Sequence, residues 1–212
     1  MKLKVCGLKN RENILDVLAT KPNFIGLIFY DKSPRYVGDK LEANFVQSIS
    51  TSKKVGVFVN ESEIKMLDIA SRYGLDFLQL HGTETVKFCK QIQESIPVIK
   101  AFQIDDDFDF STVKEYENAC TYFLFDSKSK QYGGSGQIFN WEKLTEYKLQ
   151  KPFFLSGGID LENIEQVLLL KSKLPNLYAV DVNSRFEKAP GIKDVSKIKL
   201  ISNKIYTNEL PG

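Results

Sequence analysis

The sequence predicts a closed (β/α)8 barrel, also called a TIM barrel, built as one minimal α/β domain over residues 1–205. Short apolar runs rich in β-branched and aromatic residues recur along the chain, and their starts are 21 to 30 residues apart. Each interval fits one strand and the helix after it, so eight units fill the 212 residues. The runs are almost continuously apolar, which is typical of parallel strands covered on both faces. An open doubly wound sheet is the alternative, but it usually has fewer strands.

Eight runs are the expected strands, and together they extend over most of the chain. In order, they are Lys2–Cys6, Phe24–Tyr30, Lys54–Asn60, Phe77–His81, Val98–Ile104, Tyr122–Asp126, Pro152–Ser156 and Leu177–Asn183. Because these eight strands are parallel and sequential, we expect the first to pair with the last and close the barrel.

Helical periodicity and capping residues stand between these runs. Asn10 is expected to begin the first helix, whose buried face would contain Ile14 and Leu15. Gly74 is expected to end the third helix, after an apolar stripe that includes Ile64. The other N-cap signals are Asp39 with Glu42, Asp160 and Asp194.

Composition and charge argue against several functional classes. The formal net charge of +2 creates no overall field that would attract nucleic acid or an anionic membrane. The apolar runs are far shorter than the roughly 20 residues that span a bilayer. Three widely spaced cysteines, Cys6, Cys89 and Cys120, suggest free thiols and a cytoplasmic location. The single histidine, His81, argues against a metal site, and no cofactor is expected. The last residues, 206–212, are expected to form a disordered tail.

Candidate catalytic residues stand at the carboxyl ends of the strands, where barrel enzymes place their active sites. Cys6 ends the first strand and Asp126 the sixth, on opposite walls of the barrel. Nearby helix N-termini would lower the pKa of the thiol and favour a thiolate base, and the carboxyl group could act as an acid. Gly157 and Gly158 follow the seventh strand, where this fold usually binds phosphate. Together these residues predict proton transfer on a sugar phosphate, although each also has a structural interpretation as packing, cap or turn.

Further polar residues stand at or near the strand ends. Arg35 follows the second strand, where its guanidinium could bind a substrate carboxylate or remain a solvated loop charge. By strand parity Lys4 points inward, and Asp181 does so on the neighbouring eighth strand. A buried lysine needs a partner, so we expect a Lys4–Asp181 ion pair inside the barrel. Gln79 and His81 end the fourth strand.

A series of short motifs follows one another in a characteristic order. They are KVCGL (4–8), FIGLIF (24–29), SPRYV (33–37), VGVFVN (55–60), LQLHG (78–82), FDS (125–127), GGSG (133–136), FNW (139–141), LSGGI (155–159) and GIKD (191–194). In order and spacing they resemble the phosphoribosylanthranilate isomerase family of tryptophan biosynthesis, over nearly the whole chain. The glycine-rich motif at 133–136 would be either a flexible linker or a loop over the substrate.

The resemblance implies a cofactor-free isomerase that converts N-(5-phosphoribosyl)anthranilate to 1-(2-carboxyphenylamino)-1-deoxyribulose 5-phosphate by an Amadori rearrangement. It implies that Cys6 is the general base, Asp126 the general acid and Arg35 the ligand of the anthranilate carboxylate. The other implied substrate-binding residues are Gln79, His81, Gly157, Gly158, Asp181, Ser184 and Arg185. The expected partner is this small molecule, for an enzyme that is a monomer or a homodimer.

One segment departs from the family pattern, and three other functions compete with the isomerase. The family commonly has an SSGVE-type run after the last strand, whereas residues 183–187 read NSRFE and lack its glycine.

A histidine-pathway isomerase of this fold would have an aspartate in place of Cys6. Indole-glycerol-phosphate synthase would need a lysine and glutamates at strand ends. A barrel that binds ligand without catalysis would not need Cys6, Asp126 and Arg35 together.

Overall fold

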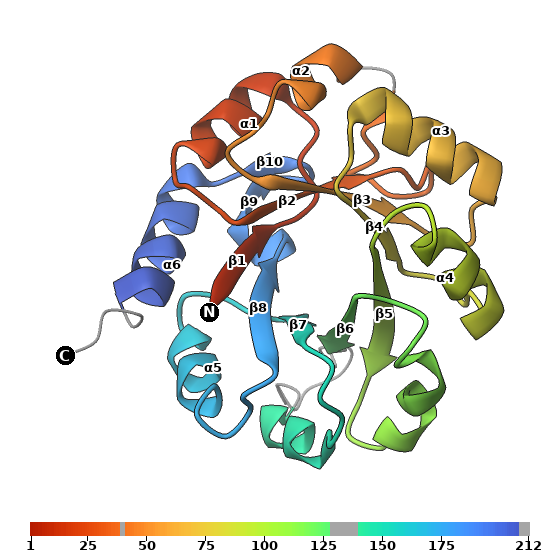
Figure 1. The fold of residues 1–212 in the computed structure, drawn as a ribbon. Helices are drawn as coiled ribbons and strands as arrows, with labels where there is room; N and C mark the ends of the chain where they lie inside the picture. Colours follow the sequence, from red (N-terminus) through yellow and green to blue (C-terminus); the bar gives the residue numbers. More distant parts are fainter. Residues whose placement is uncertain (39–40, 128–139, 208–212) are drawn as a thin grey trace.

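A computed structural model describes residues 1–38, 41–127 and 140–207 and confirms the closed barrel (Figure 1). Eight parallel strands pair in sequence order, and the first also pairs with the last. The strands are β1 Lys2–Val5, β2 Phe24–Ile28, β3 Lys53–Phe58, β4 Phe77–Leu80, β5 Val98–Ile104, β6 Tyr122–Ser127, β7 Phe153–Ser156 and β8 Leu177–Val182. Because the ring is closed, all eight carboxyl ends meet at one mouth.

Helices surround the barrel, as Figure 1 shows. The α-helices are α1 Arg11–Leu18, α2 Ala43–Gln47, α3 Glu63–Tyr73, α4 Val86–Gln93, α5 Ile164–Leu170 and α6 Val195–Thr207. Two crossovers that lacked a helix signal in the sequence form the 3-10 helices η2 Phe110–Tyr116 and η3 Trp141–Glu146. The sequence did not predict the elements between β8 and α6, which are η4 Ser184–Phe186 and a hairpin of β9 Glu187–Ala189 and β10 Ile192–Lys193.

Three predicted caps are confirmed. The side chain of Asn10 accepts a hydrogen bond from the α1 backbone, and Gly74 ends α3 in the left-handed conformation. Asp194 accepts two hydrogen bonds from the backbone of the first turn of α6. Asp160 instead caps the turn before α5, and Asp39 lies outside the described residues.

The predicted buried faces of two helices were partly wrong. Ile14 is fully buried, but Leu15 is 51% exposed, and Ile64 of α3 is 84% exposed. Consecutive helical residues point about 100° apart, so the residue beside a buried position turns toward solvent. The face of α3 that packs on the barrel contains Met66 and Ile69 instead.

The barrel interior changes from apolar to polar toward its mouth. Along β6 the inward-facing residues progress from Leu124 to Asp126, and along β8 from Ala179 to Asp181. The apolar layer below the polar groups is one cluster of Phe24, Val55, Ile99, Ala101, Leu124, Phe154 and Ala179. This packed floor closes the barrel, so the polar groups above it open only toward the mouth.

The C-terminal helix extends further than expected. Tyr206 and Thr207, which we assigned to the tail, are the last residues of α6, and the Tyr206 hydroxyl donates to the backbone oxygen of Lys21 at 2.9 Å. Residues 208–212 and the glycine-rich motif at 133–136 lie outside the described residues. None of the helices in the described ranges is long and apolar enough to cross a membrane.

Candidate active site

A cavity of about 220 Å³ opens at the carboxyl ends of the strands. Every predicted site residue except Arg35 lines it. These residues are Cys6, Gln79, His81, Asp126, Gly157, Gly158, Asp181, Ser184 and Arg185. The closed topology of the sheet therefore gathers side chains that are up to 179 residues apart in the sequence.

Cys6, directly after β1, is only 4% exposed and is held beside Gly26 of β2. A Cβ atom on Gly26 would lie 2.6 Å from the Cys6 sulfur, so this position accommodates the thiol only because it is glycine. Burial raises the pKa of the thiol, and the ammonium group of Lys4 opposes that effect only in part. Our expectation of a lowered thiol pKa was wrong, because desolvation outweighs the nearby positive charge.

The predicted Lys4–Asp181 ion pair is confirmed, with Nζ 2.7 Å from Oδ2 and both side chains buried. Burial lowers the pKa of Lys4, but the charges of Asp181 and Cys6 outweigh it and leave this pKa raised. Burial also raises the pKa of Asp181, which the Lys4 ammonium offsets in part. The other carboxylate oxygen, Oδ1, is buried and has no hydrogen-bond partner among the described residues.

A row of hydrogen bonds crosses the cavity floor from Lys4 to Asp126. The Lys4 ammonium donates to Oε1 of Gln79 at 2.7 Å. The amide nitrogen of Gln79 lies 2.7 Å from Nδ1 of His81, and Nε2 of His81 lies 3.3 Å from the Asp126 carboxylate. Gln79 is 1% exposed, whereas His81 and Asp126 are partly open to the cavity.

Arg35 lies outside the cavity lining because Glu187 of β9 holds its guanidinium. Nε and Nη2 of Arg35 donate to the Glu187 carboxylate at 2.7 to 3.0 Å. Glu187 also accepts from Lys193 at 2.8 Å. Burial would raise the pKa of Glu187, but the hydrogen bonds from Arg35 and Lys193 outweigh it and lower this pKa. Arg35 is therefore an anchored side chain rather than a solvated charge.

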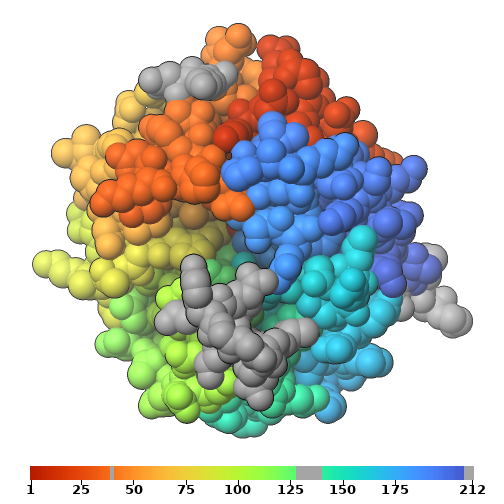
Figure 2. Space-filling model, turned by 180° about the vertical axis from the view of Figure 1, so that it is seen from behind, coloured from red at the N-terminus to blue at the C-terminus, as the bar shows by residue number. Residues whose placement is uncertain are grey.

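The Arg35–Glu187 pair joins two segments that are distant in the sequence. Figure 2 shows the segment after β2 (orange) against the segment after β8 (blue). Gly7 makes the approach possible, because a Cβ atom there would lie 2.8 Å from Cδ of Arg35. Sequence reasoning missed Glu187, since its partner is 152 residues away in a connection without regular spacing.

The turn after β7 and the turn after β8 form one rim of the cavity. Gly157 and Gly158 have φ angles of +89° and +65°. A Cβ atom on Gly157 would lie 2.2 Å from the backbone oxygen of Ser127, so only glycine fits there. Ser184 and Arg185 belong to η4 and are exposed on the same cavity. Arg185 therefore adds a positively charged side chain to this rim of the cavity.

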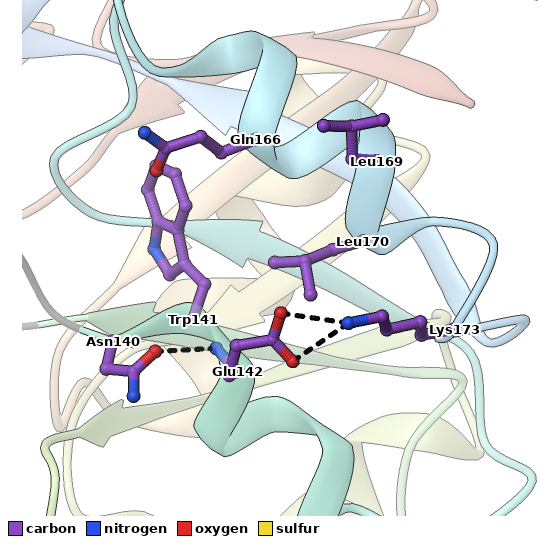
Figure 3. Close-up of a pocket in the computed structure, with 7 residues that line it drawn as sticks. All are labelled: Asn140, Trp141, Glu142, Gln166, Leu169, Leu170 and Lys173. Atoms are coloured by element: carbon purple, nitrogen blue, oxygen red, sulfur yellow. Dashed lines mark hydrogen bonds and ion pairs between the residues drawn. The ribbon is translucent and has the colours of Figure 1, made fainter.

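A larger hollow of about 550 Å³ lies between η3 and α5 (Figure 3). It contains none of the predicted site residues, and an ion pair between Glu142 and Lys173 spans one side of it. Its lining residues are Asn140, Trp141, Glu142, Gln166, Leu169, Leu170 and Lys173. Within the described ranges, histidine, cysteine and acidic side chains form no group of three suited to a metal ion. The predicted site residues in the described ranges, apart from Arg35, thus line the cavity at the barrel mouth and not this hollow.

Comparisons with known proteins agree on one family. The family model described as N-(5'phosphoribosyl)anthranilate (PRA) isomerase matches residues 3–204. The N-(5'-phosphoribosyl)anthranilate isomerase of Parabacteroides distasonis is 44% identical over 94% of this chain and 90% of its own length. That of Caldanaerobacter subterraneus is 40% identical over 97% and 98%.

Solved structures lead to the same family. The phosphoribosyl anthranilate isomerase of Thermotoga maritima superposes with a TM-score of 0.83 at 33% identity, over 98% of this chain and 99% of its own. A phosphoribosyl anthranilate isomerase in complex with reduced 1-(o-carboxyphenylamino)-1-deoxyribulose 5-phosphate gives a TM-score of 0.81 at 30% identity, with the same coverage. On the sequence match and this shared fold, the chain belongs to the N-(5'-phosphoribosyl)anthranilate isomerase family.

Proposed function

We propose that this enzyme converts N-(5'-phosphoribosyl)anthranilate to 1-(2-carboxyphenylamino)-1-deoxyribulose 5-phosphate in tryptophan biosynthesis. The observation that carries the proposal is the pairing of a thiol and a carboxyl group across one cavity. Cys6 follows β1 and Asp126 belongs to β6, so the two groups would face a substrate in this cavity from opposite walls. A base and an acid on opposite sides are what an acid–base isomerisation requires.

The proposed reaction begins with Asp126 as the general acid. Its proton goes to the furanose ring oxygen while the lone pair of the anilino nitrogen forms a C=N bond, which breaks the C1'–O bond and gives a Schiff base. Cys6, as the thiolate, then removes the proton from C2', and the resulting electron pair neutralises the iminium nitrogen to give an enolamine. The Cys6 thiol then returns its proton to C1' while the hydroxyl on C2' gives its proton back to Asp126, which converts the enolamine to the ketone and restores both residues. The steps involve only proton transfers and electron-pair shifts within the substrate.

The remaining residues would hold the two ends of the substrate. Gly157 and Gly158 allow backbone N–H groups to approach the phosphate, and the exposed guanidinium of Arg185 adds a positive charge on the same rim. Glu187 occupies Nε and Nη2 of Arg35, which leaves Nη1 for the anthranilate carboxylate. Asp181 also lines the cavity, and its carboxylate would accept a hydrogen bond from the substrate.

The setting that we propose is a cytoplasmic enzyme whose partner is this small molecule rather than nucleic acid. Its three cysteines are free and buried, which suits a reducing compartment, and its net charge is only +2. A structural relative from Thermotoga maritima, 30% identical with a TM-score of 0.76 and 97% of this chain covered, is described as a dimeric enzyme from which monomers were generated. Because the residues that line the cavity all belong to one chain, the site is the same in a monomer and in a homodimer.

Turnover of N-(5'-phosphoribosyl)anthranilate, followed by the loss of its fluorescence, tests the function. We expect wild-type activity and losses of at least about 10²-fold in kcat for Cys6→Ala and for Asp126→Asn, since each removes one proton-transfer group. Near wild-type rates in either variant would overturn the role of that residue. An inactive wild-type protein would overturn the proposed function.

A further inference from the structure

The row of hydrogen bonds from Lys4 to Asp126 has a fixed direction. A lysine ammonium has only N–H donors, so the atom of Gln79 that lies 2.7 Å from Lys4 Nζ must be the carbonyl oxygen. The amide NH2 group of Gln79 therefore points to the other side, where it lies 2.7 Å from Nδ1 of His81. Asp181 fixes Lys4 in turn through the 2.7 Å ion pair.

This direction decides which nitrogen of His81 has the proton. An NH2 group can only donate, so Nδ1 must accept with its lone pair, and the ring proton then lies on Nε2. Nε2 is the nitrogen that faces Asp126, at 3.3 Å from Oδ2. His81 is thereby a donor toward the acid. The opposite tautomer would place two donors, the Gln79 amide and an Nδ1 proton, against each other.

The tautomer matters for the acid because a carboxyl group holds its proton on one oxygen. When Nε2–H donates to Oδ2, the acidic proton of Asp126 lies on Oδ1, from which it can pass to the substrate. The same N–H stabilises the carboxylate after the proton has moved. In the opposite tautomer Nε2 would be an acceptor, and Asp126 would donate its proton to His81 instead.

We propose that Gln79 is a positioning residue that bridges Lys4 and His81, fixes the imidazole as the Nε2–H tautomer, and so orients Asp126 toward the substrate. The role in catalysis rests on the proposed function. It replaces the substrate contact that the family resemblance implied for Gln79, because this side chain is 1% exposed and both ends of its amide are bonded within the protein.

The single histidine of the chain makes the tautomer directly measurable. In a ¹⁵N-labelled protein, a long-range ¹H–¹⁵N correlation spectrum distinguishes a protonated from an unprotonated ring nitrogen without any assignment problem. For the wild type we expect a protonated Nε2 and an unprotonated Nδ1. The reverse pattern in the wild type would overturn the proposal, whatever the variants do.

Two substitutions at Gln79 shift the pattern in different ways. Gln79→Met removes the bridge, so we expect both nitrogens to move toward the average of two tautomers. Gln79→Glu replaces the NH2 donor with an acceptor, so we expect a proton on Nδ1. The matched control is Gln150→Met, at an exposed position just before β7 and thus at the opposite end of the barrel, which should keep the wild-type pattern. A wild-type pattern in Gln79→Met and Gln79→Glu would overturn the proposal.

The kinetic test separates this role from a purely structural one. We expect kcat of Gln79→Met to fall about tenfold or more, as a fraction of the ~10²–10⁴-fold that a general acid contributes, while KM changes little. A rise in KM with unchanged kcat would instead indicate a substrate contact and overturn the positioning role. If the wild type does not turn over the substrate, the proposed function fails, and the spectra still decide the tautomer.

Discussion

Two opposed effects act on Cys6, and their balance decides when its thiol can serve as a base. Burial raises the pKa of the thiol, and the neighbouring ammonium of Lys4 lowers it. Asp181 adds to the effect of burial, whereas Lys193, a second buried cation, adds to that of Lys4, which acts more strongly on the thiol. Asp181 keeps Lys4 charged, and the Lys4 ammonium in turn favours the thiolate form of Cys6.

The pH dependence of Lys4→Met tests this support. The base acts as the thiolate, so kcat/KM rises with pH as Cys6 loses its proton. Without the ammonium the pKa of the thiol is higher still, and we expect this rise to shift by at least about one pH unit toward alkaline pH, which corresponds to about 1.4 kcal/mol. The measurement is kcat/KM against pH for both proteins.

Lys100→Met is the control for that shift. Lys100 is nearly as buried as Lys4 and pairs with a buried carboxylate, Glu84, at 2.9 Å, but its charge does not act on the Cys6 thiol. Its loss perturbs the barrel to a similar degree without removing the cation next to Cys6. Superimposable pH profiles for wild type and Lys4→Met, or an equal shift in Lys100→Met, would contradict the role of Lys4.

Glu187 is expected to act through Arg35. In Glu187→Gln the guanidinium loses its charged partner and is less firmly fixed, so we expect KM to rise about tenfold, the equivalent of one charge-assisted hydrogen bond at about 1.4 kcal/mol. N-(5'-phosphoribosyl)aniline, the analogue in which aniline replaces anthranilate, has no carboxylate for Arg35 to bind. Its KM should change little, and an equal increase for both substrates would show that Glu187 supports the whole site rather than carboxylate binding.

At the scale of one element, the turn after β7 provides a matched pair of glycines. Gly157→Ala would place a methyl group against the backbone of Ser127, whereas Gly158→Ala places it in open space. Both positions have positive φ, which costs a non-glycine residue roughly 1–2 kcal/mol. We expect urea unfolding to show a loss within that range for Gly158→Ala and a clearly larger loss, with lower kcat/KM, for Gly157→Ala. Equal losses would show that the contact with Ser127 is relieved at no cost.

How far sequence could predict the elements depends on whether the signal is local. Each strand is a continuous apolar run, and caps such as Gly74 are local, so both were identified correctly. The Lys4–Asp181 pair could also be predicted, because closure and parity place two regular strands in register. Arg35 and Glu187 meet between irregular connections, where no period relates their positions. The raised pKa of the Cys6 thiol was missed for a related reason, since burial is a property of the assembled barrel.

The whole molecule depends on the join between its first and last units. β1 pairs with β8, and α1 is tied to β10 by Asn13, a buried residue of that helix. The Asn13 amide donates to the backbone oxygen of Lys193 at 3.0 Å, and the backbone N–H of Lys193 donates back to the Asn13 side chain at 2.7 Å. The Lys193 ammonium donates to Glu187, which holds Arg35, so the contact between α1 and β10 also helps to position Arg35.

Asn13→Ala should therefore weaken the closed state of the barrel. The substitution leaves a buried N–H and a buried C=O of Lys193 without their partner, so we expect the free energy of unfolding to fall by about 2 kcal/mol or more. Asn44→Ala, at an exposed position of α2, measures the helix-propensity gain that accompanies the same exchange, and it should be neutral or slightly stabilising. Urea unfolding of both variants gives the comparison. If they unfold at the same urea concentration, water or a backbone shift satisfies Lys193, and the strand pairing of β1 with β8 alone holds the ring closed.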